Sequence, residues 1–373
     1  FLKKWSMKPE IYSGFASLER LQQFEKENLC FVCDPYLAES DSLKRILGYV
    51  KRTNTVEIYS DIIPDPPIET VVDGIEKMTK HKPTVVIAVG GGSAIDTAKA
   101  MLFFYKRTTG NKVKRFVAIP TTSGTGSEVT SASVITDTQN KIKYPIFHEA
   151  IIPHEAILDA SLVMSSPPSV TTFSGLDVLT HALESLASVN RTNYTNALAE
   201  KATELVFQFL PTCVNQGMEL DARIQMHEAS TLAGLAFDAA GLGVCHAIAH
   251  QVGANFKVPH GLANSMLLPY VIQANSKDKE TRKNYARISR KLGICPPSLP
   301  DHLAVSNLAQ AVQQLAIECK APIKLNSFGI QEEAALSAED VIANNALNDT
   351  TFKTNPIQFS AEEIKEIYRN IIK

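Results

Sequence analysis

Hydrophobic residues in the first part of the chain fall into short runs rich in β-branched side chains, separated by stretches with helical spacing. An amphipathic stretch at residues 68–79 lies between two of these runs. Such alternation is typical of a parallel sheet flanked by helices, and this is the α/β fold class that we expect here. The four runs are residues 29–33, 55–59, 84–89 and 116–119.

The pattern changes after Pro167 and Pro168. Beyond these residues, long segments carry apolar side chains at helical spacing with few β-rich runs, which predicts an all-helical region. We therefore expect two domains, an α/β domain over residues 1–166 and an all-helical domain over residues 167–373. The clearest helical segments are residues 196–210, 221–237 and 301–319.

The composition is that of a soluble globular protein, with 373 residues of which 45% are hydrophobic and 20% charged. Lys and Arg (37) nearly balance Asp and Glu (39), so we expect neither nucleic acid nor a membrane as a partner, but a small molecule. No apolar run reaches the roughly 18 residues of a membrane span, and the first residues lack the apolar core of a signal peptide. These observations predict a cytoplasmic protein.

The six cysteines are scattered along a long chain and are expected to be free thiols. Cys30 and Cys33 form a C-x-x-C pattern, but they lie in a β-rich run. Because a strand sends residues three positions apart to opposite faces, the pattern argues against a redox or metal pair.

A glycine-rich turn follows the β-rich run at residues 84–89. The run leads into Gly90, Gly91, Gly92 and Ser93 and then into a helical stretch. Glycines let a backbone approach a phosphate closely, and a helix N-terminus offers unpaired N–H groups. A plain strand-to-helix turn is the alternative, because the spacing departs from the G-x-G-x-x-G pattern of dinucleotide sites.

The next β-rich run ends in a second loop, residues 120–128, which contains Thr121, Thr122 and Thr125. Ligands bind at the carboxyl edge of parallel sheets, where such hydroxyl groups can contact phosphate and ribose. A plain turn would also use Ser, Thr and Gly. Two loops of this kind after neighbouring strands favour a nucleotide site.

Asp34 directly follows the first β-rich run. In a dinucleotide site, a carboxylate at this place accepts hydrogen bonds from the adenosine ribose and repels a 2'-phosphate, which favours NAD over NADP. The alternative is an Asp that caps a turn before Pro35.

Histidines provide the sharpest chemical signal. Asp177 and His181 are four positions apart and would share one helix face. Further along, His246, His250 and His260 cluster in an apolar segment, in a chain with only nine histidines. A single histidine there would more often be an ordinary core residue, but the cluster beside a carboxylate–histidine pair favours a metal. Such ligands suit Fe(II), Zn(II), Mn(II) or Co(II).

At these residues the chain resembles the iron-containing, group III alcohol dehydrogenase family, from about Tyr12 to the C-terminus. The matching segments are residues 90–99, 120–128, 175–184 and 246–264. Within the family it is most similar to the 1-propanol dehydrogenases of bacterial microcompartments that degrade 1,2-propanediol. This second likeness lies in residues 142–145, 198–202 and 229–234.

The resemblance implies a role for each matching residue. His250 would stand beside the metal without ligating it and is our candidate for passing the proton, while Phe237 would line the substrate pocket. The metal, Fe(II) with Zn(II) as the alternative, would be bound by Asp177, His181, His246 and His260. The contacts to NAD would come from Asp34, Gly91, Gly92, Ser93, Thr121, Thr122, Thr125, Lys143 and Leu158.

Together these features predict an NAD-dependent alcohol dehydrogenase that interconverts a short primary alcohol and its aldehyde by hydride transfer, with 1-propanol and propanal favoured. The α/β domain would bind NAD, and the helical domain would bind metal and substrate. We also expect a homo-oligomer, and the resemblance implies a place inside a microcompartment with its shell or partner enzymes.

Three alternatives remain. One is a glycerol or polyol dehydrogenase of the same fold, using Zn(II). Another is a lyase like dehydroquinate synthase, which would need clustered Lys and Arg, whereas the helical segments between Leu176 and Val271 contain few. The third is a non-catalytic metal-binding scaffold, which would have no use for the two phosphate-type loops.

Overall fold

The computed structural model of the protein describes residues 6–63, 66–138 and 142–373. The chain divides into two compact units, Phe1–Ser165 and Ser166–Lys373. This boundary lies one residue before the one expected from the change of pattern after Pro167 and Pro168.

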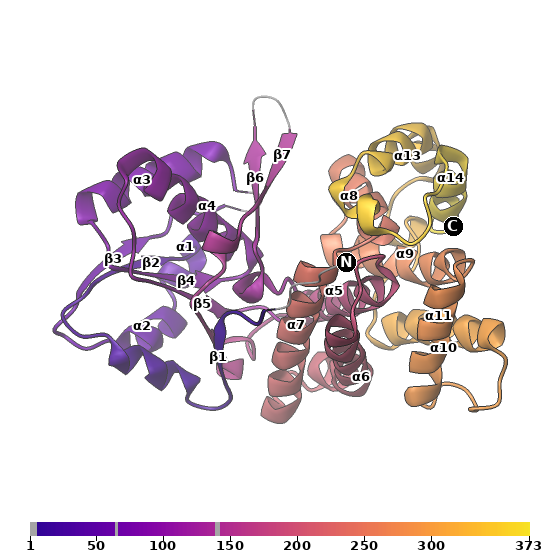
Figure 1. The fold of residues 1–373 in the computed structure, drawn as a ribbon, viewed down its shortest axis with the longest axis horizontal. Helices are drawn as coiled ribbons and strands as arrows, with labels where there is room; N and C mark the ends of the chain where they lie inside the picture. The colour runs from indigo at the N-terminus through magenta and orange to yellow at the C-terminus, as the bar shows by residue number, and fades with distance from the viewer. Residues whose placement is uncertain (1–5, 64–65, 139–141) are drawn as a thin grey trace. The chain divides into compact units, whose positions relative to one another are not determined.

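Unit 1 is built on a six-stranded sheet in which every pair of neighbouring strands is parallel (Figure 1). The strand order is β1-β8-β5-β4-β2-β3. The strands are β1 (Glu10–Ser13), β2 (Asn28–Val32), β3 (Thr55–Tyr59), β4 (Val85–Gly90), β5 (Arg115–Pro120) and β8 (Glu155–Leu158). A separate antiparallel pair consists of β6 (Ala132–Asp137) and β7 (Ile142–Phe147).

Helices cover both faces of this sheet, which explains why the inner strands are almost continuously apolar. Along β4, Val86 and Ala88 pack with one set of buried residues, whereas Val85 and Ile87 pack with another on the opposite face. The first face is covered by α3 (Ile68–His81) and α4 (Gly92–Thr109), and the second by η1 (Ser17–Gln23) and α2 (Asp41–Gly48). The predicted α/β fold class is confirmed for this unit.

The strand order places a crossover between β3 and β4. After β2 the chain forms β3 on one side of it, then crosses to form β4 on the other side. In open parallel sheets, ligands bind outside the carboxyl ends of the strands at such a switch point. Here the switch point lies after β2 and β4, where Asp34 and Gly91 follow their strands.

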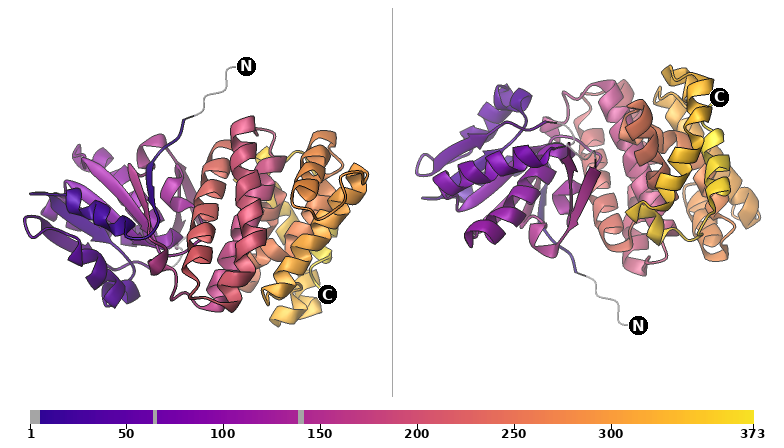
Figure 2. Two further views of the ribbon diagram at one scale, coloured as in Figure 1. Left: turned by 90° about the horizontal axis from the view of Figure 1, so that it is seen from below. Right: turned by 90° about the horizontal axis from the view of Figure 1, so that it is seen from above.

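Unit 2 contains only helices over residues 166–373, all of which the structure describes. Its central element is α5 (Pro168–Ala187), which is buried around almost its whole circumference from Gly175 onward, including its polar residues Asp177, His181 and Glu184. It packs against α6 (Asn193–Asn215), α7 (Leu220–Ala240) and α9 (His260–Asn275), which lie alongside it (Figures 1 and 2). The predicted all-helical second half is confirmed.

The remaining helical elements are short in unit 1 and long in the first part of unit 2. Unit 1 also has α1 (Pro35–Ala38), η2 (Ser127–Val129), η3 (Glu149–Ile151) and η4 (Ala160–Leu162). The other long helices of unit 2 are α6 (Asn193–Asn215), α7 (Leu220–Ala240), α8 (Val244–Phe256), α9 (His260–Asn275), α10 (Lys279–Lys291) and α11 (Asp301–Glu318). They are followed by η5 (Asn326–Phe328), α12 (Glu332–Ser337), α13 (Glu339–Leu347), η6 (Thr350–Thr354) and α14 (Ala361–Arg369).

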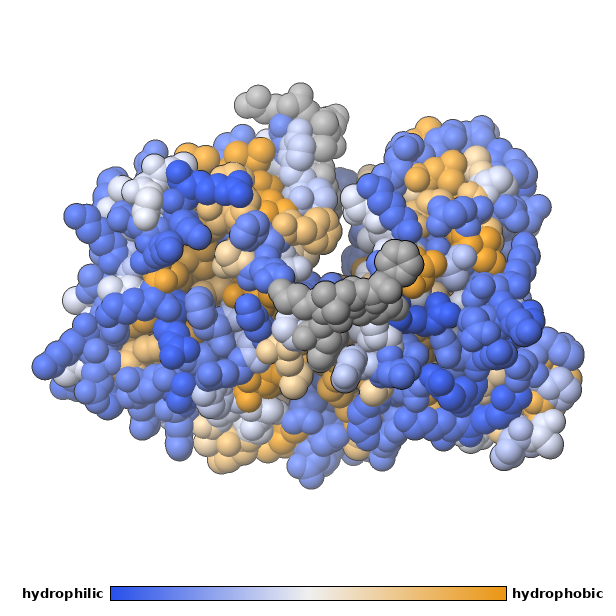
Figure 3. All heavy atoms as spheres, viewed as in Figure 1, coloured by the Kyte–Doolittle hydropathy of each residue, from blue (hydrophilic) through white to orange (hydrophobic). Residues whose placement is uncertain are grey.

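The face drawn in Figure 3 is mostly hydrophilic, with hydrophobic residues gathered in smaller patches. Among the described residues, no single helix is long and apolar enough to cross a membrane, although α7 and α8, bent by 107°, together reach that length and composition. All six cysteines are free and buried. Cys30 and Cys33 pack on opposite faces of the sheet, as their spacing on a strand requires.

Candidate active site

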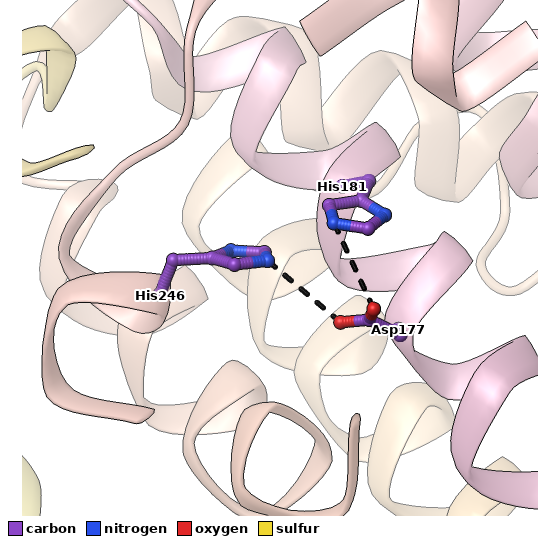
Figure 4. Close-up of side chains that lie close together, drawn as sticks. All are labelled: Asp177, His181 and His246. Atoms are coloured by element: carbon purple, nitrogen blue, oxygen red, sulfur yellow. Dashed lines mark ion pairs between the residues drawn. The ribbon is translucent and has the colours of Figure 1, made fainter. Parts of the chain in front are cut away.

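Three buried side chains of unit 2 converge on one point (Figure 4). Asp177 and His181 lie one turn apart on α5, and His246 lies in the first turn of α8. The Nε2 atom of His181 lies 3.8 Å from Asp177 Oδ2, and the Nε2 atom of His246 lies 3.7 Å from Asp177 Oδ1. Two ligands of a tetrahedral ion with bonds of about 2.1 Å are about 3.4 Å apart, so these gaps suit a shared divalent ion.

The donor atoms of this group also fit a metal chemically. His246 Nε2, the ring atom that faces Asp177, is buried and finds no hydrogen-bond partner among the described residues. Burial lowers the pKa of His246 well below its ordinary value, and the neighbouring His181 and His260 lower it further. A metal ion binds a neutral imidazole through a ring nitrogen whose lone pair makes no hydrogen bond.

Asp177 supplies the negative charge of the group. Burial raises the pKa of this carboxyl, but His181, His260 and His246, together with the amide of Asn264, outweigh that effect and lower the pKa below its ordinary value. Asp177 is therefore an ionised carboxylate enclosed by imidazoles. One carboxylate with several imidazoles is a donor set that suits Fe(II) and Zn(II).

Glu184 contacts His246 of this group. The sequence motifs did not predict it as a site residue. It is buried, its Oε1 accepts a hydrogen bond from the backbone of Cys245 at 2.7 Å, and its Oε2 lies 2.6 Å from His246 Nδ1. Burial raises the pKa of Glu184 to about 7, against backbone hydrogen bonds that lower it. Its position seven residues after Asp177 puts it on the same face of α5, and this spacing could have predicted its role.

His260 lies next to this group but outside the three residues whose ligand atoms lie within 4.8 Å of one another. Its Nε2 atom lies 3.6 Å from Asp177 Oδ1 and 3.2 Å from the side-chain amide nitrogen of Asn264, which donates to Asp177 Oδ1 at 2.9 Å. Asn264 therefore joins the two side chains. The sequence motifs did not predict Asn264 as a site residue either.

Gly261 lets α9 come this close to α5. A Cβ atom at this position would lie 2.0 Å from the carbonyl oxygen of Phe173 and 3.1 Å from the Cβ of Asp177. Only glycine fits, so the residue next to His260 is required for the approach of the two helices.

His250 stands one turn along α8 from His246. Its side chain is 40% exposed, and its ring stacks on that of His260 with the centroids 5.3 Å apart. Its Nδ1 atom lies 2.8 Å from Asp349 Oδ2, a contact between residues far apart in the sequence. His250 is thus beside the group of Asp177, His181 and His246, but it is not one of these three converging residues.

Phe237, expected to line the substrate pocket, lies near the end of α7. Its ring centroid lies 4.4 Å from that of His181. An apolar ring therefore borders the group of Asp177, His181 and His246.

In unit 1, the two glycine- and hydroxyl-rich loops meet at the carboxyl edge of the sheet. A Cβ atom at Gly91 would lie 3.5 Å from the Thr122 side chain, and one at Gly92 would lie 2.9 Å from the Thr125 side chain. The N-cap residue of α4 is Gly91, which has no side chain to accept from the first N–H groups of the helix, and this suits an anion-binding helix N-terminus. Ser93 is the second residue of α4, and the backbone N–H of Thr121 donates to Gly90 at 3.0 Å.

Asp34 lies beside this turn. A Cβ atom at Gly90 would lie 3.7 Å from Asp34 Oδ2, while Asp34 Oδ1 accepts a hydrogen bond from Leu37 at 2.8 Å and caps α1. One oxygen therefore caps α1, as the alternative interpretation of this residue expected, while the other faces the glycine turn, and the contact to a ribose stays a prediction.

Two further residues of the predicted nucleotide set lie on other strands. Leu158 is the last residue of β8 and is buried. Lys143 lies on β7, paired with Thr136 of β6, and its side chain is outside what the structure describes.

Two side chains of α4, Asp96 and the buried Lys99, bond to Ser127 at the end of the second loop and to the residues that follow it. The Nζ atom of Lys99 donates to the carbonyl of Thr130 at 2.7 Å and to that of Ala132 at 2.8 Å. Asp96, one turn earlier, accepts hydrogen bonds from the Ser127 hydroxyl and, at 3.1 Å, from the backbone of Val134. These bonds hold the start of β6 and the preceding loop against the helix that follows the glycine turn.

Comparison with known proteins agrees with this arrangement. Residues 9–160 match the family profile described as iron-containing alcohol dehydrogenase, and residues 171–372 match that of the C-terminal part of the same family. The chain is 44% identical to 1-propanol dehydrogenase PduQ of Citrobacter freundii, over 100% of both chains. It is 36% identical to the NADPH-dependent butanol dehydrogenase of Clostridium saccharobutylicum, over 98% of this chain and 97% of that one.

A solved structure shows the same fold. The crystal structure of a 1,3-propanediol oxidoreductase superimposes with a TM-score of 0.92 at 29% identity, over 100% of both chains. The family profiles and these relatives cover both units. The chain therefore belongs to the iron-containing alcohol dehydrogenase family, and it is an oxidoreductase with the activity of an alcohol dehydrogenase.

Proposed function

We propose that this enzyme uses NAD and a divalent metal to interconvert a short primary alcohol and its aldehyde, with 1-propanol and propanal favoured. The observation that carries the proposal is the buried group of Asp177, His181 and His246, with a bare imidazole nitrogen on His246. His260, close to Asp177, would complete the ligand set.

The metal and NAD would have different roles in the reaction. A bound divalent ion supplies Lewis-acid activation of the alcohol or aldehyde oxygen, and NAD supplies the acceptor or donor of hydride. Within the protein, Asp177 contributes the charge that retains a cation, and Glu184 keeps His246 in the ligating tautomer. We favour Fe(II), from the family to which the chain belongs, with Zn(II) as the alternative.

The preference for NAD over NADP is proposed from Asp34. Its Oδ2 faces the glycine turn after β4, where the ribose of a dinucleotide would lie and where a 2'-phosphate would meet a like charge. Gly91, Gly92, Ser93, Thr121, Thr122 and Thr125 would bind the phosphates and ribose, with Lys143 and Leu158 as further contacts. The butanol dehydrogenase relative is named as NADPH-dependent, so this preference needs a direct test.

The proposed substrate class follows from the apolar border of the metal-binding group. The ring of Phe237 packs beside that of His181. A substrate hydroxyl buried there without a partner would cost roughly 1–3 kcal/mol, which disfavours polyols. The name of the 1-propanol dehydrogenase relative points the same way.

A polyol dehydrogenase using Zn(II) is the second candidate. It is favoured by the likeness to the 1,3-propanediol oxidoreductase structure, whose named substrate carries two hydroxyls. A lyase of the dehydroquinate synthase type is disfavoured, because it would need clustered Lys and Arg side chains to bind its substrate. In the ligand-bearing region, the buried Arg223 is already bonded to Thr171 and Gly217.

The test compares kcat/KM for propanal, butanal, lactaldehyde and dihydroxyacetone with NADH, in enzyme stripped of metal and reloaded with Fe(II) without oxygen or with Zn(II). We expect activity only after reloading, and values for propanal and butanal within about a hundredfold of each other, because one methylene is worth only about 1–3 kcal/mol. A preference for dihydroxyacetone would move the protein to the polyol class.

We further propose a cytoplasmic homo-oligomer that works inside a microcompartment with an aldehyde dehydrogenase that needs its NAD. This rests on the resemblance to the branch of the family found in microcompartments that degrade 1,2-propanediol. Fractionation of cells that produce such compartments tests it, because the proposal requires the enzyme to co-purify with the shells.

A further inference from the structure

A carboxylate from the C-terminal part of unit 2 reaches the histidine beside the metal-binding group. Asp349 lies at the N-terminus of η6, after α13. Its two oxygens have different partners. Oδ2 lies 2.8 Å from His250 Nδ1, whereas Oδ1 accepts hydrogen bonds from the backbone N–H and the hydroxyl of Thr351, at 2.9 and 2.8 Å.

These contacts fix both the position and the hydrogen-bonding role of the carboxylate. The side chain of Asp349 is only 13% exposed, and Thr351 holds one oxygen in place. Burial raises the pKa of Asp349, but the hydrogen bond and charge of His250 and the bonds from Thr351 lower it to about 2. At neutral pH the group is an anion that can only accept hydrogen bonds.

The consequence for His250 is a defined tautomer. Because Asp349 can only accept, His250 Nδ1 must carry a proton, and the lone pair of the neutral ring is then on Nε2. The ring is held from a second side by stacking on His260, with an interplanar angle of 17°. Both its orientation and its acceptor atom are therefore set by neighbours.

We propose that Asp349 is the positioning residue for proton transfer at His250. This rests on the proposed function. In alcohol oxidation the C–H bond breaks and its electron pair leaves as hydride to NAD, while the hydroxyl proton passes to Nε2 of His250 and on to water. In aldehyde reduction the same atoms move in reverse. The hydrogen bond from Asp349 keeps Nε2 as the acceptor.

Asp349→Asn tests this with almost no change in shape. The backbone N–H of Thr351 needs an acceptor, so the amide oxygen would take the place of Oδ1 and the amide nitrogen would face His250. His250 Nδ1 would then have to accept, and the proton would move to Nε2. The variant should hold the ring in the wrong tautomer.

In the metal-loaded full-length enzyme, Asp349→Asn should keep its metal and its affinity for NADH, with KM little changed and kcat lowered by about a hundredfold or more, as for loss of general acid–base catalysis. Nitrogen-15 NMR of labelled histidines in the Zn(II)-loaded protein should show the proton on Nε2. Thr351→Val is the matched control, because it removes the hydroxyl bond to Oδ1 but leaves the contact to His250.

A double variant separates positioning from a merely structural role. With His250→Ala in place, adding Asp349→Asn should lower kcat no further, because residues that act as a unit are not additive. An equal loss in both backgrounds, or an unchanged tautomer with normal kcat, would overturn the proposal. The wild-type rate tests the proposed function separately, and the NMR measurement does not depend on activity.

Discussion

Glu184 Oε2 lies 2.6 Å from His246 Nδ1, and this contact determines which nitrogen of the ring faces Asp177. The same carboxylate accepts a hydrogen bond from the backbone of Cys245, so it also caps the N-terminus of α8. One side chain of α5 thus places both the helix that carries His246 and the ring itself. Carboxylate–histidine pairs of this kind orient metal ligands in many proteins.

Glu184→Gln should weaken metal binding by roughly 10–100-fold, as is common when such a partner is lost. The variant keeps the volume of the side chain but removes the anionic acceptor. Metal affinity, measured by competition with a chelator, checks this. Ser185→Ala is the control, because Ser185 is also fully buried on α5 and its hydroxyl donates to the carbonyl of His181 within the same helix. Equal affinities in wild type and Glu184→Gln would refute the role.

Gly261→Ala should destabilise the protein by about 3 kcal/mol or more, the upper end of overpacking costs, because the new methyl group would overlap the Phe173 carbonyl. Metal affinity should fall with it, since α9 carries His260. Gly253→Ala on α8 is the control. Its Cβ would lie 3.4 Å from the Val258 carbonyl oxygen, so the change should stay within about 1 kcal/mol. Urea unfolding of the two variants would show whether their losses differ as expected.

Asp34→Gly should raise kcat/KM with NADPH by about tenfold or more, as relief of about 1.4 kcal/mol of repulsion would give. Asp34 also caps α1, so Asp34→Asn serves as the control that keeps a capping oxygen while removing the charge. Both variants should shift the ratio of the two cofactors in the same direction. An unchanged ratio would remove Asp34 from the ribose site.

At low pH the protein should lose the part of its free energy of unfolding that Asp349 contributes. Its pKa is about 2 in the folded chain and about 3.9 in an unfolded one, so the contribution is complete above pH about 4 and is lost as the pH falls to about 2. The shift corresponds to about 2.5 kcal/mol. In metal-free protein, the difference in unfolding free energy between wild type and Asp349→Asn should shrink over this range. A constant difference would mean that the carboxylate is not held as described.

The strands and helices with strong periodicity were predictable, and those with weak patterns were not. The run at residues 84–89 became β4, and the amphipathic stretch at residues 68–79 became α3. By contrast, β1 is four residues long and mostly exposed, and β8 begins with the buried Glu155, paired with Arg20. A buried carboxylate held by a distant arginine breaks the apolar pattern by which strands are recognised.

The same limit applies to the active site. Asp177 and His181 could be grouped because a helix brings residues four apart together. Asn264 and Asp349 act on residues 87 and 99 positions away, and nothing local in the sequence indicates those contacts. Side chains that bind a metal have characteristic residue types, whereas the side chains that support them are defined by tertiary packing.

The central claim is that the Asp177 group holds a metal that the dehydrogenase needs. The most direct measurement takes wild type and Asp177→Ala, both loaded with Fe(II) without oxygen, and records metal content and NADH formation on adding 1-propanol. We expect stoichiometric metal and steady NADH formation in the wild type, and loss of both in the variant with its helical content unchanged. Stoichiometric metal and near-normal turnover in Asp177→Ala would contradict the account.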